Sequence, residues 1–374
     1  MRITFLWRET YIAMVVYLTL SGLGFAVLLL LNRYLGYGVT SLLRRWDAVN
    51  YLAVAAHGYP DHLVYRADGA PDFNTLAFFP LVPTLIRGLH LAAGLPVEYG
   101  GMLVSWVAGA VAASGVHTLA RAIIGCRAAF VCVALWACSP YAFVLWIPYS
   151  EAVFTAVLMW ALVALFARRW GTAGLLCALA GTVRPTAVVL VGVAGLAAMA
   201  ALMARRDGSR PLATLAIAPL GVVGSWLFLG SRIGSATGWF EAERAWNQSF
   251  DFGRATLIAL RDAAGAHSPD VRYTAVFTMI AAAAIGTAAL SVDRRVPWLL
   301  VLLVASAWAL MMGTSGAQYS KPRFMLPFLP VLLLPLAAPL SRVHWQLRWL
   351  VYASGAVFAG WYGTGLLVQP VAAP

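Results

Sequence analysis

The sequence predicts an all-α protein that crosses a membrane many times, and three observations support this fold class. Of its 374 residues, 62% are hydrophobic and only 11% are charged, and the mean hydropathy is +0.81. Several stretches of about 20 residues carry almost no charge, and a helix needs that length to cross a bilayer. Backbone polar groups in lipid must be satisfied within each segment, which favours helices. We therefore expect one domain over residues 1–374, without a separate soluble domain.

Twelve apolar segments are candidates for crossing the bilayer. We expect the first to be an uncleaved anchor, because Asn32, Arg33 and Tyr34 follow it where a small-residue cleavage site would be needed. The segments are 11–31, 76–94, 102–120, 128–147, 151–168, 171–183, 186–204, 211–230, 272–291, 296–313, 324–340 and 349–367.

Arginine clusters indicate which segments cross, because short cytoplasmic loops are rich in Arg and Lys. Six tight clusters can all be cytoplasmic only if 32–101 contains no complete crossing. The clusters are Arg2/Arg8, Arg121/Arg127, Arg168/Arg169, Arg205/Arg206/Arg210, Arg294/Arg295 and Arg342/Arg348.

Segment 76–94 is the weakest candidate in that region. Two prolines interrupt its start, and Arg87 and His90 occupy its second half. An arginine at mid-depth costs about 3 kcal/mol or more. We predict that this segment dips into or lies along the outer leaflet, so that about eleven helices span, within a range of 11–13. The alternative is twelve full spans with one arginine pair on the wrong side.

The acidic residues then gather outside the membrane. Eleven of fourteen fall in or beside the outer segments, chiefly the first outer loop 32–101 and the second large outer loop 231–271. No acid lies in the middle of a helix, whereas ion-coupled transporters usually carry ionisable groups there. The net charge of +12 is attributed to topology and to membrane lipid partners, with no nucleic-acid partner. The four cysteines lack metal spacing with histidine and are expected to be packing residues.

The stretch 44–59, RRWDAVNYLAVAAHGY, concentrates polar and aromatic residues directly after the first crossing. If it is helical, Asp47, Asn50, Tyr51 and Val54 share one face. Asp47 is our candidate catalytic base, at the membrane surface beside lipid head groups. The competing interpretation is a solvated surface helix whose aspartate has no role in chemistry.

Three further outer stretches carry charged candidates. In 139–151, Ser150 is expected to cap the next helix, and Glu151 then lies in its first turn, where the helix dipole favours a carboxylate. A structural role for Glu151 is favoured over a role as a second acid. Arg184 follows a short apolar run, and Lys321 and Arg323 stand in an outer loop. Arginine binds phosphate bidentately, so these three cations are candidate phosphate ligands.

The long loop 231–271 allows two interpretations. Its stretch GWFEAERAWNQSF can be an amphipathic helix on the bilayer, with Trp239, Phe240 and Trp246 as interfacial anchors. It can also cover the site and contact an acceptor. We expect a mixture of both.

These residues suit glycosyl transfer from a lipid phosphate. Asp47 can take the acceptor proton, and one carboxylate is enough for direct displacement with inversion. The cations can meet the charge that grows on the departing phosphate. A transmembrane groove can hold the isoprenoid. No metal and no cofactor are required, and the nucleotide-binding and hydrolase motifs are absent from the sequence.

The ordered motifs resemble those of PIG-V-like mannosyltransferases, which belong to the GT-C class. They are Trp46-Asp47, His57-Gly58-Tyr59, Phe78-Phe79-Pro80, Ser139-Pro140, Tyr149-Ser150-Glu151, Arg184 and Pro322-Arg323-Phe324. Pro185 and Thr186 stand where the family has Ser-Asn after its arginine. Together the motifs cover most of the chain in order.

The resemblance implies the GT-C fold, with surface-lying helices in 32–101, and a bacterial member of the family. It also implies a polyprenyl-phosphate mannose donor, inverting transfer to a lipid or glycan acceptor, and Asp47 as base. The active site would face outward from a bacterial plasma membrane. We expect Trp46, Asn50, His57, Tyr59 and Tyr149 to contact substrate. The alternatives are a transporter or flippase of lipid-linked sugars, without catalysis, and a non-catalytic scaffold.

Overall fold

The computed structural model describes residues 6–265, 271–316 and 318–368. Within these ranges the chain is helical, and its only extended pairings are two isolated bridges, Tyr65 with Pro71 and Phe250 with Thr314. The prediction of an all-α membrane protein is therefore confirmed.

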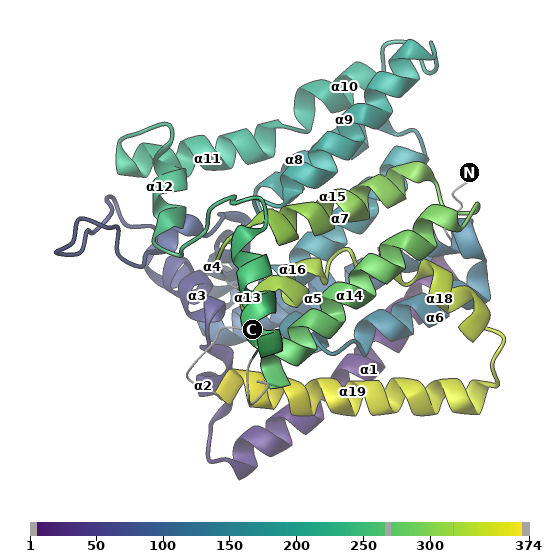
Figure 1. The fold of residues 1–374 in the computed structure, drawn as a ribbon, viewed down its shortest axis with the longest axis horizontal. Coiled ribbons are helices and arrows are strands. Elements are labelled where there is room, and N and C mark those ends of the chain that lie inside the picture. Colours follow the sequence, from purple (N-terminus) through teal and green to yellow (C-terminus); the bar gives the residue numbers. More distant parts are fainter. Residues whose placement is uncertain (1–5, 266–270, 317, 369–374) are drawn as a thin grey trace.

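Helices of two lengths build the bundle (Figure 1). Those long and apolar enough to cross a membrane are α1 (Trp7–Tyr34), α5 (Val97–Ile124), the joined α10 and α11 (Pro211–Ile217 and Leu220–Ile233) and α19 (Trp345–Val368). Shorter apolar helices are α4 (Leu81–Ala93), α6 (Cys126–Ala137), α7 (Glu151–Phe166), α8 (Trp170–Gly181), α9 (Ala187–Met203), α14 (Val271–Val292) and α15 (Trp298–Gly313). The predicted segment 324–340 is broken into α16 (Lys321–Met325), α17 (Leu329–Leu332) and α18 (Leu334–Leu340).

Helix α7 lies at the centre of the bundle. Fourteen of its sixteen residues are buried, and it packs against α5 and α8. A helix that is apolar on all sides is stable only when other elements surround it. The first residue of α7, Glu151, is consequently a carboxylate at the edge of a fully apolar core.

Helices α1 and α19 run side by side in the same direction (Figure 1). A Cβ on Gly360 would lie 2.3 Å from the carbonyl oxygen of Gly24 and 2.9 Å from the Cβ of Val27. A Cβ on Gly24 would lie 2.8 Å from the carbonyl oxygen of Ala356. Glycine at these positions lets the two backbones touch. Two parallel helices that both cross a membrane give an odd total of crossings, counted from the first to the second, and the number of spans, eleven or twelve, stays a prediction.

Helix α4 starts and ends on one face of the bundle. The backbone N–H of Leu81 donates to the carbonyl of Thr182, 2.9 Å away, at the end of α8. Just after α4, a Cβ on Gly101 would meet the Pro148 ring. Thr182 and Pro148 flank the α7–α8 hairpin, so they lie on the same face. That segment 76–94 does not cross the bilayer stays a prediction.

Two connecting regions dock on that face, which we call the Asp47 face. The first contains α2 (Val39–Leu43), α3 (Asp47–His57) and η1 (Thr75–Ala77), and the second contains α12 (Gly238–Arg244) and α13 (Arg254–Gly265). Trp239 of α12 is 6% exposed, stacks on Trp226 and donates its indole N–H to Ala77 O. The interpretation of Trp239 as an interfacial anchor is therefore wrong, because its ring fills the joint between the two regions.

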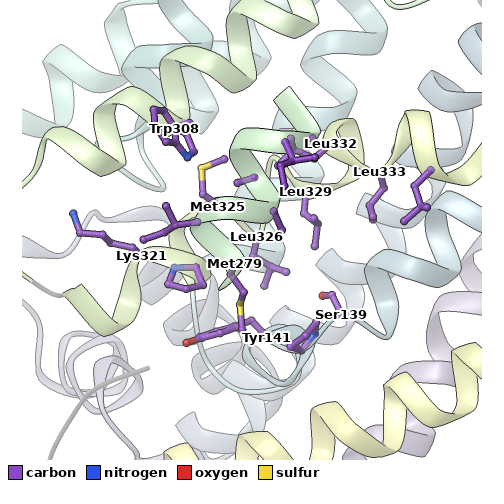
Figure 2. A pocket seen from close by; sticks show the side chains of 18 of the residues that line it. Ser139, Tyr141, Met279, Trp308, Lys321, Met325, Leu326, Leu329, Leu332 and Leu333 are labelled. Atoms are coloured by element: carbon purple, nitrogen blue, oxygen red, sulfur yellow. The ribbon is translucent and has the colours of Figure 1, made fainter. Parts of the chain in front are cut away.

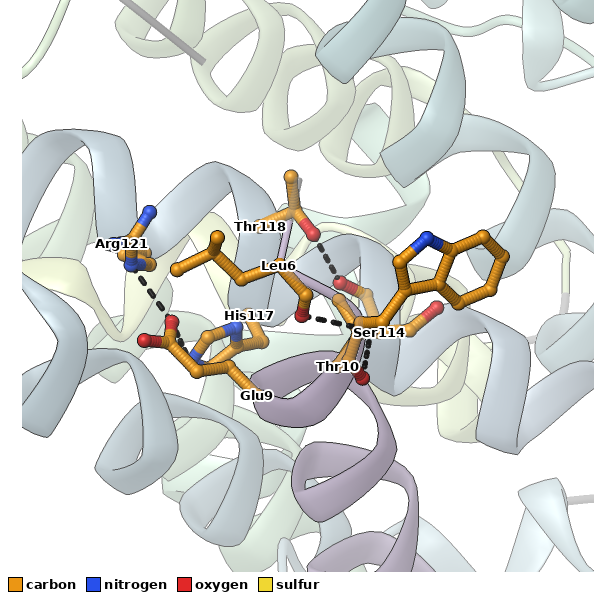
Figure 3. A network of polar contacts seen from close by, with 8 residues as sticks. Leu6, Glu9, Thr10, Ser114, His117, Thr118 and Arg121 are labelled. Carbon is orange, nitrogen blue, oxygen red and sulfur yellow. Dashed lines mark hydrogen bonds and ion pairs between the residues drawn. The ribbon is translucent and has the colours of Figure 1, made fainter. Parts of the chain in front are cut away.

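A polar network marks the opposite end of the bundle, which we call the Glu9 face (Figure 3). Arg121 Nε of α5 lies 2.7 Å from Glu9 Oε2 of α1, and His117 Nε2 lies 3.9 Å from the same oxygen. These contacts join the start of α1 to the end of α5. They lie in the region where the arginine pattern predicts a cytoplasmic surface.

Candidate active site

Asp47 is the first residue of α3, and the local backbone sets its position. Trp46, just before it, has φ 52° and ψ −129°, a conformation that costs a non-glycine residue about 1–3 kcal/mol. The Trp46 indole N–H donates to Leu366 O near the end of α19, 3.3 Å away. This anchor holds the strained turn, so Trp46 fixes the start of α3 rather than presenting its N–H to a ligand.

Four charged side chains from distant parts of the chain meet on this face. Arg323 Nη2 lies 2.8 Å from Asp47 Oδ2, and Arg323 Nε lies 3.3 Å from Glu151 Oε1. Arg184 Nη1 lies 2.6 Å from the same Glu151 oxygen. We call Asp47, Glu151, Arg184 and Arg323 the ionic cluster. The sequence motifs that carry these four residues are thus brought together by α3, α7, α16 and the turn between α8 and α9.

Burial differs sharply within the ionic cluster. The side chains of Glu151, Arg323 and Arg184 are 2%, 4% and 9% exposed, whereas Asp47 is 23% exposed. Two cations and two anions balance, as buried charges must. Glu151 is held by both arginines, and Ser150 makes no side-chain cap for α7, so the predicted Ser150 cap is wrong. Asp47 is the member of the cluster that a substrate can reach.

Aromatic rings orient the two guanidinium groups. Arg323 lies 5.1 Å from the Tyr149 ring centre and 4.8 Å from that of Phe324, and Arg184 lies 5.1 Å from the Phe324 ring centre. Such cation–π contacts stabilise a buried guanidinium. Tyr149 is fully buried. The Tyr149 ring therefore packs against the Arg323 guanidinium and has no exposed surface on which a sugar could pack.

One donor of Arg323 has no partner. Its Nη1 atom is buried and makes no hydrogen bond to any residue in the described ranges. An unsatisfied buried donor costs about 1–3 kcal/mol, and more when it is charged. An anionic ligand beside Asp47 would satisfy this donor.

The other predicted substrate residues differ in how close they lie to the ionic cluster. Asn50, one turn after Asp47, is half-buried. His57 is exposed at the far end of α3, about 15 Å along the helix from Asp47 at 1.5 Å per residue. Tyr59 donates its hydroxyl to Phe78 O at 2.7 Å and packs edge-on against Phe228. Asn50 therefore lies near the ionic cluster, whereas His57 is remote and Tyr59 braces a loop.

Lys321 and Arg323 point in different directions, although they were grouped as phosphate ligands. Residues two apart on a helix do not share a face. Lys321 Nζ donates to the carbonyl oxygens of Met311 and Thr314, at 2.5 and 2.8 Å, and its side chain is 2% exposed. Burial lowers the pKa of Lys321 to about 8, against the opposing effect of Asp251. Lys321 thus stands outside the ionic cluster.

A cavity of about 690 Å³ begins beside Lys321 (Figure 2). Apolar side chains of α14, α15 and α16–α18 form most of its wall. Ser139, Tyr141 and Lys321 are its polar members, and Tyr141 donates its hydroxyl to Tyr319 O at 3.3 Å. Pro322 also lines the cavity, directly before Arg323 in the chain. The four residues of the ionic cluster do not line this chamber, and Pro322 is the chain neighbour that connects the two.

Two residues that were not predicted as site residues also belong to this region. Tyr51 is buried in α3, where burial raises its pKa beside Arg184, Glu151 and Asp47. Burial, and then the charge of Asp47, raise the pKa of Glu243 in α12 to about 8. The helical period of α3 points to Tyr51. No local pattern distinguishes Glu243 from Glu241, because the packing of α12 against η1, which in turn lies against α3, is a long-range contact.

Metal-ligating side chains gather elsewhere. Within the described ranges, one group of three has its ligand atoms within 4.8 Å of one another, namely Glu9, His117 and Cys126 on the Glu9 face. Arg121 already pairs with this Glu9 carboxylate (Figure 3). That cation competes directly with a metal ion for the carboxylate, so we interpret the group as a structural contact.

Comparison with known proteins gives related sequences and solved structures with a similar fold. No family model matches the chain. It is 34% identical over 165 residues to GPI alpha-1,6-mannosyltransferase 2 of Cricetulus griseus, covering 41% of this chain and 31% of that protein. The Rattus norvegicus protein of the same name is 35% identical over 160 residues, covering 40% and 30%. The match therefore spans about a third of these relatives' length.

A solved structure with a similar fold is ArnT from Cupriavidus metallidurans bound to undecaprenyl phosphate. The TM-score is 0.55 at 14% sequence identity, and the alignment covers 89% of this chain and 62% of ArnT. At this identity the likeness concerns the fold. The chain thus resembles the PIG-V mannosyltransferases in sequence over two fifths of its length, and it has the GT-C glycosyltransferase fold over nearly all of it.

Proposed function

We propose that this protein is a membrane glycosyltransferase that moves a sugar, with mannose expected, from a polyprenyl-phosphate donor to a lipid or glycan acceptor. Asp47 is the general base, and the active site faces outward from the plasma membrane of a bacterium. The observation that carries the proposal is the ionic cluster, in which Asp47 pairs with Arg323 while Glu151 holds Arg323 and Arg184 together. The mannosyltransferase relatives favour mannose.

Arg323 can serve the base and the leaving group together. A guanidinium has five N–H donors, and here Nη2 holds Asp47 while Nη1 is free. A phosphate oxygen on Nη1 forms a charge-assisted hydrogen bond. Arg184, on the other side of Glu151, adds a second positive charge. Charge that grows on the departing phosphate is thus stabilised by groups already in place.

The transfer proceeds as a single displacement. The acceptor hydroxyl gives its proton to Asp47 as its oxygen attacks the anomeric carbon. The bond from that carbon to the phosphate oxygen breaks, and its electron pair leaves with the phosphate. A retaining mechanism needs a second carboxylate as nucleophile. Glu151 is 2% exposed and held by two arginines, so inversion follows.

The apolar cavity suits the isoprenoid chain. It lies among α14, α15 and α16–α18, and Lys321 stands at its edge (Figure 2). We place the first isoprene units there, with the phosphate passing Lys321 to reach Arg323. Undecaprenyl phosphate bound to ArnT, which has a similar fold, supports a lipid-linked donor.

Asp47→Asn tests the base, because it keeps the shape of the side chain and removes its basicity. We expect transfer of radiolabelled mannose from undecaprenyl-phosphate mannose to fall about 10²–10⁴-fold, while donor binding stays within a few-fold. Asp68→Asn is the matched control, since Asp68 is an exposed acid of the same connecting region. Transfer near the wild-type rate in Asp47→Asn would rule out Asp47 as the base. A flippase without a base would tolerate the same substitution.

A further inference from the structure

Glu243 differs from the other carboxylates of this protein. Each of the other described acids makes a hydrogen bond or an ion pair: for example, Glu151 binds two arginines, Glu98 binds Arg44, and Glu241 accepts from the Tyr65 hydroxyl. The Glu243 side chain has no such partner in the described part of the chain. The Glu243 side chain is half-buried, so its carboxyl group keeps its hydrogen-bonding capacity open to a ligand that reaches this face.

The backbone around Glu243 is held firmly. Trp239 donates to Ala77 O, Trp246 donates to Asn74 O at 3.3 Å, and Asn74 Nδ2 donates to Ala242 O at 3.4 Å. These bonds fasten α12 to residues 74–77, which lie against α3. Glu243 therefore has a fixed place beside the catalytic helix and is not on a free loop.

Ring contacts connect the end of α12 to the start of α3. Trp246, three residues after Glu243, packs on Phe78, and Phe78 packs on Tyr51, one turn after Asp47. Besides burial, the charge of Asp47 raises the pKa of Glu243. Glu243 therefore lies near the first turns of α3.

Aromatic rings line the same end. Phe73 is 65% exposed, and its ring lies edge-on to Trp246 with centroids 5.0 Å apart. Phe78 lies 5.4 Å from Trp246 and 5.0 Å from Tyr51. Sugar rings pack their C–H faces on such side chains, because an aromatic ring presents a large apolar surface with a negative face. An exposed ring next to an unpartnered carboxyl group is a combination that fits a carbohydrate.

We propose that Glu243 binds the acceptor: it hydrogen-bonds a second hydroxyl of an acceptor sugar while Phe73 and Trp246 pack against the ring, so that the attacking hydroxyl meets Asp47. The inference rests on the proposed glycosyl transfer and names the acceptor class as a carbohydrate head group rather than a simple alcohol. In its protonated form Glu243 both donates and accepts, and it places no second negative charge beside Asp47.

The acceptor assay uses labelled undecaprenyl-phosphate mannose with octyl α-mannoside or 1-octanol. Glu243→Ala is expected to raise the KM for octyl α-mannoside about tenfold, the loss of roughly one hydrogen bond. Donor KM and donor hydrolysis by water should stay within about twofold. Glu241→Ala, two residues away on the other side of α12, is the control and should change none of these values. Unchanged acceptor KM in Glu243→Ala, or an equal rise in donor KM, overturns the inference, as does a wild-type enzyme that prefers 1-octanol.

The Glu243→Gln variant distinguishes a role that depends on protonation of Glu243 from a role that depends only on the shape of its side chain. Glutamine mimics the protonated acid. The acceptor KM of the Glu243→Gln variant should therefore equal that of wild type below pH 7. Above pH 8 the acceptor KM of wild type should rise as Glu243 loses its proton, whereas that of Glu243→Gln should not. The charged or titratable groups on the elements around Glu243 are Asp47, Tyr51 and His57 of α3, Arg232 of α11, and Glu241 and Arg244 of α12, while η1 contributes none. A wild-type rise that persists in Glu243→Gln overturns the assignment to Glu243.

Infrared spectroscopy measures the protonation of Glu243 without an activity assay. The protonated Glu243 carboxyl band should disappear near pH 8 in wild type, at lower pH in Asp47→Asn, and be absent from Glu243→Gln. Failure of wild type to transfer mannose to any probe, with this band present, refutes the proposed function and the acceptor role with it. Absence of the band in a protein that transfers mannose refutes the inference alone.

Discussion

Glu151→Gln is the substitution whose outcome the ionic cluster determines most closely. Its carboxylate is 2% exposed and lies 2.6 Å from Arg184 and 3.3 Å from Arg323. The substitution leaves two buried guanidinium groups with Asp47 as the one remaining anion of the ionic cluster. The net charge of the cluster therefore rises from zero to +1. Removing one member of a buried ion pair costs about 3–5 kcal/mol, because the remaining charge stays desolvated.

Glu98→Gln is the matched control for this experiment. It removes another glutamate–arginine contact on the same face, but Arg44 is 59% exposed, and such partly solvated pairs contribute about 0–1 kcal/mol. Thermal unfolding in detergent should therefore separate the two variants clearly. Transfer from undecaprenyl-phosphate mannose should fall with Glu151→Gln and stay near wild type with Glu98→Gln.

A double variant tests the charge argument itself. Glu151→Gln with Arg184→Met returns the cluster to neutrality, leaving Asp47 and Arg323 paired. Its loss of stability should be smaller than the sum of the two single losses, since residues in one network are not additive. Equal stability of Glu151→Gln and Glu98→Gln, or simple additivity in the double variant, would refute the reasoning.

Three further predictions concern other parts of the structure. Arg323→Lys should raise the donor KM at least tenfold, because lysine cannot hold Asp47 and a phosphate through separate edges; steady-state kinetics with varied donor measures this, and an unchanged KM would remove Arg323 from the donor site. Gly24→Val should lower the unfolding temperature, since a Cβ there would lie 2.2 Å from the Trp146 ring; an unchanged unfolding temperature would contradict the close helix contact. Wild-type stability should fall relative to Glu243→Gln between about pH 4.5 and pH 8, because burial raises the folded-state pKa of this acid to about 8 and the folded state then binds more protons than the unfolded state; parallel stability curves would contradict that shift.

Much of the fold follows from local pattern. The apolar segments, the helix at 47–57 and the helix within 76–94 follow from charge, proline and hydrophobic spacing, and the structure has helices at these places. Asp47, Glu151, Arg184 and Arg323 were also candidates from their motifs. Their direct contact could not be deduced, because it depends on how α3, α7 and α16 pack.

The residues whose surroundings differ from the prediction share one physical cause. Lys321 is two residues from Arg323, yet helix geometry turns it towards Met311 and the cavity. Trp239 has the composition of a membrane anchor, yet it fills a joint between two connecting regions. Glu243 carries no distinguishing pattern. In each case long-range packing decides the direction of a side chain, and a linear pattern contains no information about that direction.

The most direct test of the account is the position of a lipid phosphate relative to Asp47. A cryo-EM structure of the protein with undecaprenyl phosphate should place the phosphate within hydrogen-bonding distance of Arg323 Nη1, with its chain in the cavity beside Lys321 and Asp47 facing the open side. Phosphate density on the Glu9 face, or a chain that leaves the cavity empty, would contradict the account.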